Sequence, residues 1–113
     1  MSIGRERLGE LLALIVSEKP ADRVEGADTV RDWAGSFSAF EARVVVRVLA
    51  VAATVEERDG REAQLLAILT VFDPRTMTRD DIAPVLDIDP DRLDRGEREY
   101  VNDLLESLGW KQS

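Results

Sequence analysis

The sequence predicts an all-α protein that forms a single domain over residues 1–113, with about six helices in a helical-bundle or HEAT-like packing. Apolar residues recur at helical spacing in four separate segments, and Pro, Gly and Asp residues mark short turns between them. The length lies in the commonest range for one domain, and 44% hydrophobic residues are enough to build a core. The sequence shows no internal repeat, linker or low-complexity tract.

Two helices are expected in the N-terminal third. The first covers about residues 3–18 and ends before Pro20, which lacks a backbone donor and clashes with a continuing helix. Its inner face carries apolar residues at i, i+3, i+4 and i+7, namely Leu8, Leu11, Leu12 and Ile15. A short second helix is expected after Asp28, which can cap it. That helix turns Trp33 inward before Gly35 stops it.

A long central helix is expected over about residues 39–58, with Ser38 as its N-cap. Its polar residues lie on one narrow side and the rest of its circumference is apolar, which is typical of a helix surrounded by others. The β-branched residues 44–46 are a competing strand signal. The helix is favoured because alanines follow these residues and no turn residue occurs before the Asp59-Gly60 turn.

Three further helices are expected after the Asp59-Gly60 turn. The first covers about residues 61–72. Thr78 and Asp81 stand three residues apart before an apolar segment, which resembles a capping box at the start of the next helix. Pro90 opens the last helix and Gly109 ends it, in agreement with the preference for Pro at helix starts and Gly just beyond helix ends.

The residue types present argue against catalysis and against a bound cofactor. The chain has no histidine and no cysteine, which removes the commonest general base, the thiol nucleophile and the usual zinc ligands. The adjacent carboxylates Glu56-Glu57 and Asp80-Asp81 point about 100° apart on a helix and do not converge. The glycines are scattered and form no phosphate-binding loop. We therefore expect a protein that is not an enzyme and needs no cofactor or metal.

The segment from Asp87 to Asp91 has the alternating Asp pattern of a calcium loop but fails at decisive positions. Counted from Asp87, the sixth position needs Gly and holds Arg92, and the twelfth needs a bidentate Glu and holds Arg98. A simpler interpretation is that Asp89 caps the helix opened by Pro90, while Asp91 and Asp94 favour its positive N-terminal end.

A helix-turn-helix DNA-binding regulator remains an alternative for residues 79–98. A DNA-reading helix needs cations on its surface and flanks. This segment holds four arginines and seven acidic residues, so its net charge is unfavourable for phosphate binding. We expect its arginines to pair with neighbouring carboxylates, for example Arg95 with Glu99.

The charge of the chain favours a basic protein partner. The formal net charge is -8, and residues 73–113 contribute 11 acidic against 6 basic residues. Such a surface attracts a cationic cleft and repels nucleic acid and anionic membranes. The candidate partner-binding residues are the exposed acidic residues of this half and two aromatic residues that could anchor the partner: Asp87, Asp89, Asp91, Asp94, Glu99, Tyr100, Asp103, Glu106 and Trp110.

The chain resembles the small, acidic, all-α immunity proteins encoded beside polymorphic or contact-dependent toxins in bacteria. The resemblance covers about residues 38–108. It lies in the helix opening at residues 38–43, in the Glu-Ala-rich opening at 61–69, and in the Glu-Tyr-hydrophobic ending at 97–106. The resemblance implies non-covalent occlusion of a cognate toxin, often a nuclease, with no catalytic residues to carry over.

The expected location is the cytoplasm. The longest apolar runs are shorter than the roughly 20 residues that span a bilayer, and the N-terminus lacks the features of a signal peptide. An alternative in a different class is a structural or adaptor module, with possible homodimerisation through its apolar helices.

Overall fold

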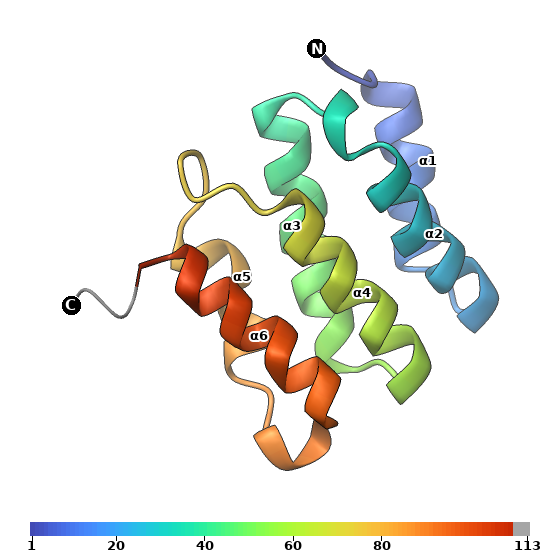
Figure 1. Ribbon diagram of the computed structural model, residues 1–113. Coiled ribbons are helices and arrows are strands. Elements are labelled where there is room, and N and C mark those ends of the chain that lie inside the picture. The colour runs from blue at the N-terminus through green and yellow to red at the C-terminus, as the bar shows by residue number, and fades with distance from the viewer. Residues whose placement is uncertain (110–113) are drawn as a thin grey trace.

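Six α-helices and two single-turn 3₁₀ helices make up most of residues 1–109, the part of the chain that this computed structural model describes (Figure 1). The α-helices are α1 (Arg5–Ile15), α2 (Pro20–Asp32), α3 (Ala39–Thr54), α4 (Arg58–Val71), α5 (Arg79–Leu86) and α6 (Arg95–Ser107). The 3₁₀ helices are η1 (Ala34–Ser36) and η2 (Pro90–Arg92). No strand occurs within residues 1–109, so the all-α prediction is confirmed.

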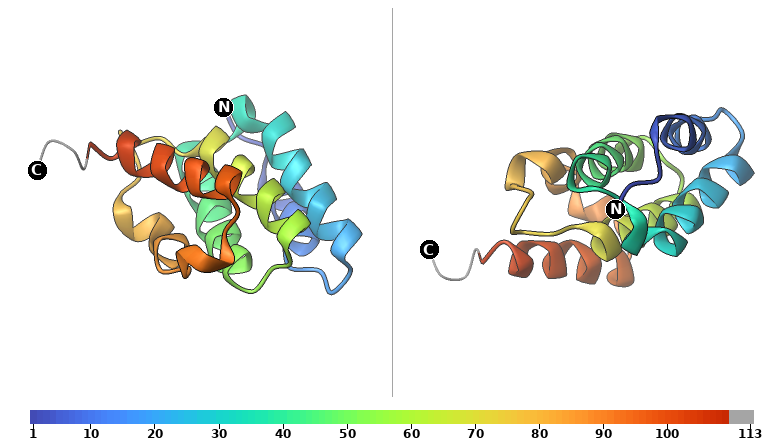
Figure 2. Two further views of the ribbon diagram at one scale, coloured as in Figure 1. Left: turned by 60° about the horizontal axis from the view of Figure 1, so that its bottom comes forward. Right: turned by 90° about the horizontal axis from the view of Figure 1, so that it is seen from above.

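The helices form two layers of three, and the right-hand view of Figure 2 shows the two layers from their edge. One layer contains α1, α3 and α5, and the other contains α2, α4 and α6; neighbours within each layer are in contact. Contacts between α1 and α2 and between α3 and α4 join the layers. The shortest dimension of the molecule is 19 Å, which matches two helices of about 10 Å each. The bundle-like packing expected from the sequence is therefore present.

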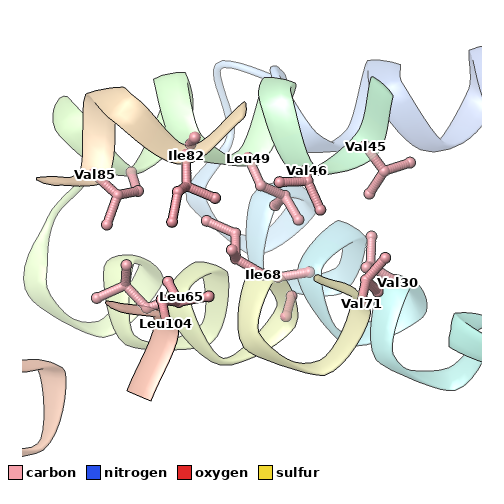
Figure 3. Packing of buried hydrophobic residues seen from close by; sticks show 14 of the residues in the cluster. Val30, Val45, Val46, Leu49, Leu65, Ile68, Val71, Ile82, Val85 and Leu104 are labelled. Atoms are coloured by element: carbon pink, nitrogen blue, oxygen red, sulfur yellow. The ribbon is translucent and has the colours of Figure 1, made fainter. Parts of the chain in front are cut away.

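The core lies between the two layers, with α3 and α4 at its centre. Figure 3 shows side chains of α3 and α5 on one side of this space and side chains of α4 and α6 on the other. The large side chains of this group that are fully buried include Val45, Val46, Leu49, Leu65, Ile68, Ile82 and Leu104. Full burial of one such side chain stabilises the fold by about 1.5–3 kcal/mol. The core thus fixes the two helix layers relative to each other, and with them the outer face of each layer.

Three predicted boundaries are wrong. The second helix starts at Pro20 and not after Asp28, because Pro at the first helical position needs no backbone donor. The third helix ends at Thr54, and Asp59-Gly60 lies in the first turn of α4 and forms no turn between helices. Pro90 opens η2 only; the last α-helix begins after Asp94, which caps it in a box with Glu97.

The capping predictions are confirmed at three other helix ends. Ser38 caps α3 in a capping box with Glu41. The backbone N–H of Thr78 donates to Asp81 Oδ2 at 2.8 Å, the reaching-back bond of the predicted box at α5. Gly109 follows the C-cap of α6 with φ of 72°, a left-handed conformation that glycine adopts without a side-chain clash.

Two glycines inside helices should respond oppositely to replacement by alanine. A Cβ at Gly26 in α2 would lie 3.1 Å from Cγ1 and from the backbone N of Ile15 in α1, so Gly26→Ala must separate these helices. We expect a loss of about 1–3 kcal/mol in the free energy of unfolding. A Cβ at Gly9 meets nothing within 4 Å, so Gly9→Ala should instead gain about 0.5–1 kcal/mol. Urea unfolding of both variants measures whether the free energy of unfolding falls or rises.

Candidate functional site

Four acidic residues are buried and bind other parts of the fold, so they are not available to a partner. They are Glu41, Glu56, Asp81 and Glu97. The Glu41 carboxylate accepts from the Ser2 hydroxyl at 2.6 Å and from the backbone N–H groups of Ile3 and Gly4 at 3.0 Å each. It thereby holds the segment before α1 against the start of α3.

Glu56 lies in the turn between α3 and α4, and its carboxylate binds side chains of both α2 and α4. Arg23 donates to it through Nε at 2.6 Å and Nη2 at 3.0 Å, and Gln64 donates through Nε2 at 3.0 Å. A Cβ at Gly60 would lie 2.7 Å from Cδ of Glu56, so the absence of a side chain there makes room for this carboxylate. Gly60 therefore has a packing role within α4.

Asp81 and Glu97 bind arginines from the preceding helices in the same layer. Arg43 and Arg47 of α3 both donate through Nε to Asp81 Oδ1, at 2.9 and 2.5 Å. Arg61 of α4 donates to the two carboxylate oxygens of Glu97 at 2.8 and 3.2 Å. Each layer is thus held together by a charged contact as well as by apolar packing.

Three of the buried carboxylates have lowered pKa values. The Ser2 hydroxyl, with the backbone N–H of Ser38, lowers the pKa of Glu41 to about 2. The hydrogen bond from Arg23 lowers the pKa of Glu56. Burial opposes ionisation of Asp81, but the hydrogen bonds from Arg43, Thr78 and Arg47 together hold its pKa below the usual value. All three favour the charged form in the folded state.

Stability should therefore fall as the pH is lowered from about 5 towards 2. Unfolded Asp and Glu have pKa values of about 3.9 and 4.3, and the folded values of Glu41, Glu56 and Asp81 are lower. The stabilisation is complete above the unfolded values and is lost as the pH falls through the folded ones. Urea midpoints measured at several pH values check this expectation. A midpoint that rises between pH 4.5 and 2.5 would contradict it.

The candidate partner-binding residues fall into two exposed groups. Glu99, Asp103 and Glu106 are exposed on α6 at i, i+4 and i+7, as expected from their spacing. Asp87, Asp89 and Asp91 are exposed around η2, where Asp89 Oδ1 accepts from the backbone N–H of Asp91 at 2.9 Å. Arg98 of α6 donates to the carbonyl of Pro90 at 3.1 Å and ties the two groups together.

The remaining candidates have other positions. Asp94 is half-buried; its carboxylate accepts from the backbone N–H of Glu97 at 2.8 Å and from Arg58 at 3.3 Å. Tyr100 is half-buried and packs against the hydrophobic core. Trp110 lies outside the described residues. The predicted pair of Arg95 and Glu99 is present, with 3.6 Å between Nε and Oε1.

The structure adds exposed acidic residues that the sequence analysis did not include among the partner-binding candidates, on the two neighbouring helices of the same layer. Glu25, Asp28 and Asp32 are exposed on α2 at i, i+3 and i+7, and Asp59 and Glu62 are exposed on α4. The helical spacing on α2 was a usable signal, but it required the helix to begin at Pro20.

We define the acidic layer by its exposed carboxylates: Glu25, Asp28, Asp32, Asp59, Glu62, Glu99, Asp103 and Glu106. Helices α2, α4 and α6 expose four arginines against these eight: Arg31, Arg58, Arg95 and Arg98. The other layer has the opposite balance. Helices α1, α3 and α5 expose three carboxylates and five arginines: Glu6, Glu10 and Asp80 against Arg5, Arg7, Arg43, Arg47 and Arg79. Negative charge is therefore concentrated on the helices of one layer.

Two further findings concern metals and membranes. Residues 1–109 contain no group of three or more acidic side chains placed to hold a metal ion. Within the same part of the chain, no helix combines the length and the apolar character needed to cross a membrane. Comparison with protein families, with curated proteins and with solved structures gave no match for this chain.

Proposed function

We propose that this protein is a cytoplasmic immunity protein that neutralises a basic toxin domain by covering its active cleft without catalysis. The observation that carries the proposal is the concentration of eight exposed carboxylates on the acidic layer. A layer of three helices can cover a cleft, and its negative potential accelerates encounter with a positive cleft. If the toxin is a nuclease, its cleft must be positive to hold phosphates, and the carboxylates would occupy their places.

The acidic layer supports this function over the DNA-binding alternative. In a helix-turn-helix reading, α6 would enter the major groove, but it presents Glu99, Asp103 and Glu106 to solvent. Residues 87–94 separate α5 from α6 and include η2, whereas the motif joins its helices by a turn of three or four residues. Both features favour binding of a cationic protein surface.

The test uses the toxin domain predicted by the resemblance, since an immunity gene directly follows the gene of its toxin. The C-terminal domain encoded by the preceding gene is expressed in bacteria with and without this chain. We expect growth arrest that this chain relieves, together with a stable complex of the two purified proteins. A preceding gene without a toxic domain, or toxicity that this chain leaves unchanged, would refute the proposal.

A further inference from the structure

The outer face of α3 carries an apolar stripe on the layer opposite the acidic one. We call Phe40, Val44, Val51 and Val55 the α3 stripe, because they share one face of the helix and its C-cap at helical spacing. Phe40, Val51 and Val55 expose 73%, 60% and 83% of their surface. Apart from Met1, Val16 at 63% is the other strongly exposed large hydrophobic residue among those described. Such a concentration marks an interaction surface.

The α3 stripe continues into a groove where α1 ends beside the C-terminal half of α3. The groove has a volume of about 630 Å³ and is lined mainly by Ile15, Val16, Val48, Val51, Ala52 and Val55. The α3 side of the lining extends from Arg47 to the start of the following turn, or about two helical turns. This length suits the i, i+4 and i+7 side chains of an amphipathic helix.

The charges at the groove are balanced at one end and unbalanced along one edge. At the end, Arg23 binds Glu56 and two backbone carbonyls, so this pair is neutral and satisfied. Along the edge, Asp81 is shared by Arg43 and Arg47, which leaves one positive charge in excess. The two arginine side chains are 48% and 51% exposed. The Nε atom of each arginine donates to Asp81. Within residues 1–109, the Nη groups of both arginines have no hydrogen-bond acceptor.

We propose that the α3 stripe and its groove dock an amphipathic helix of a partner protein that carries carboxylates on the edge facing Arg43 and Arg47. The buried Asp81 holds both guanidinium groups in place, and their outer N–H groups can donate to a carboxylate in charge-assisted hydrogen bonds. A symmetric pairing of α3 with α3 of a second copy fits less well, because Ala39–Thr54 exposes two arginines and no carboxylate to pair with them. This site is separate from the acidic layer and does not depend on the function proposed above.

The test compares two synthetic 18-residue amphipathic helices that share one apolar face and carry either Glu or Lys along its edges. Fluorescence anisotropy measures the binding of each labelled peptide to the full chain. We expect the Glu peptide to bind at least 10-fold more tightly than the Lys peptide. The formal net charge of -8 predicts the reverse order, so such a preference requires local positive charge at the binding site.

Variants locate the binding on the α3 surface. Val51→Ser/Val55→Ser changes two exposed residues and should weaken binding of the Glu peptide at least 10-fold. Arg47→Gln removes the excess positive charge but leaves Arg43 paired with the buried Asp81, and it should abolish the preference for Glu over Lys. As a control, Ala13→Ser/Ala21→Ser changes two exposed residues outside the groove and should leave both affinities unchanged.

Three results would overturn the proposal. One is binding of the Lys peptide that is as tight as that of the Glu peptide or tighter. Another is an affinity for the Glu peptide that stays the same in the Val51→Ser/Val55→Ser variant. The third is a wild-type dimer in sedimentation velocity that this double variant dissociates, because the occupant would then be a second copy. None of these results bears on binding through the acidic layer, since its carboxylates stay unchanged throughout.

Discussion

Replacing Glu97 with Gln should lower the free energy of unfolding by about 3–5 kcal/mol, because it leaves the charge of Arg61 buried without a counter-charge. Arg61 and Glu97 are 5% and 0% exposed, and two hydrogen bonds join them. The carboxamide keeps the shape of the carboxylate but offers only one acceptor oxygen where Arg61 donates to two. The free energy of unfolding of a typical domain is only about 5–15 kcal/mol in total, so a loss of this size leaves the variant close to unfolding.

An exposed pair on the same helix provides the control for this experiment. Arg95 and Glu99 are 93% and 65% exposed in their side chains, so Glu99→Gln should change the stability by less than about 1 kcal/mol. The double variant Arg61→Met/Glu97→Met leaves no unpaired charge and should lose less stability than Glu97→Gln alone. Urea unfolding followed by circular dichroism gives all three values. A double variant less stable than Glu97→Gln would show that the buried charge is not the cause.

The sequence was sufficient to predict those features that depend on residues close together in the chain. Helical periodicity predicted the fold class, and the pairs Ser38–Glu41 and Thr78–Asp81 marked two helix starts correctly. The Arg95–Glu99 contact was also predicted, because its partners are one helical turn apart. The error at Pro20 has a local cause too, since a proline that ends one helix can equally open the next.

The features that the sequence did not reveal depend on contacts between distant residues. Charged residues are normally solvated, and nothing near Glu97 marks it as buried; its partner Arg61 is 36 residues away. The same holds for Asp81, which binds Arg43 and Arg47 of α3. The expected central helix is central only in part, because Phe40 and Val55 at its two ends are exposed. The layer order that gathers acidic residues from α2, α4 and α6 on one face also requires the tertiary structure.

Reversing four carboxylates of the acidic layer should slow association with the proposed toxin domain on the order of 100-fold at low salt, since steering by complementary charge raises association rates by about 10–10³. The variant Asp28→Lys/Glu62→Lys/Glu99→Lys/Asp103→Lys changes exposed residues on α2, α4 and α6. It brings the formal net charge from -8 to zero. Asp94 is left unchanged, because it caps α6 and its loss would destabilise the helix. Stopped-flow mixing at several salt concentrations measures the rate.

A second variant with the same net charge separates the acidic layer from the charge of the whole molecule. Glu6→Lys/Glu10→Lys/Glu18→Lys/Asp80→Lys also gives a net charge of zero, but its exposed residues lie outside α2, α4 and α6. At physiological salt the field of a charge reaches only about 8 Å, so carboxylates far from the contact contribute little to the rate. At physiological salt we therefore expect the control to slow association much less than the acidic-layer variant, and the difference to shrink as more salt is added. Equal slowing by both variants would remove the acidic layer as the contact surface and direct attention to α3.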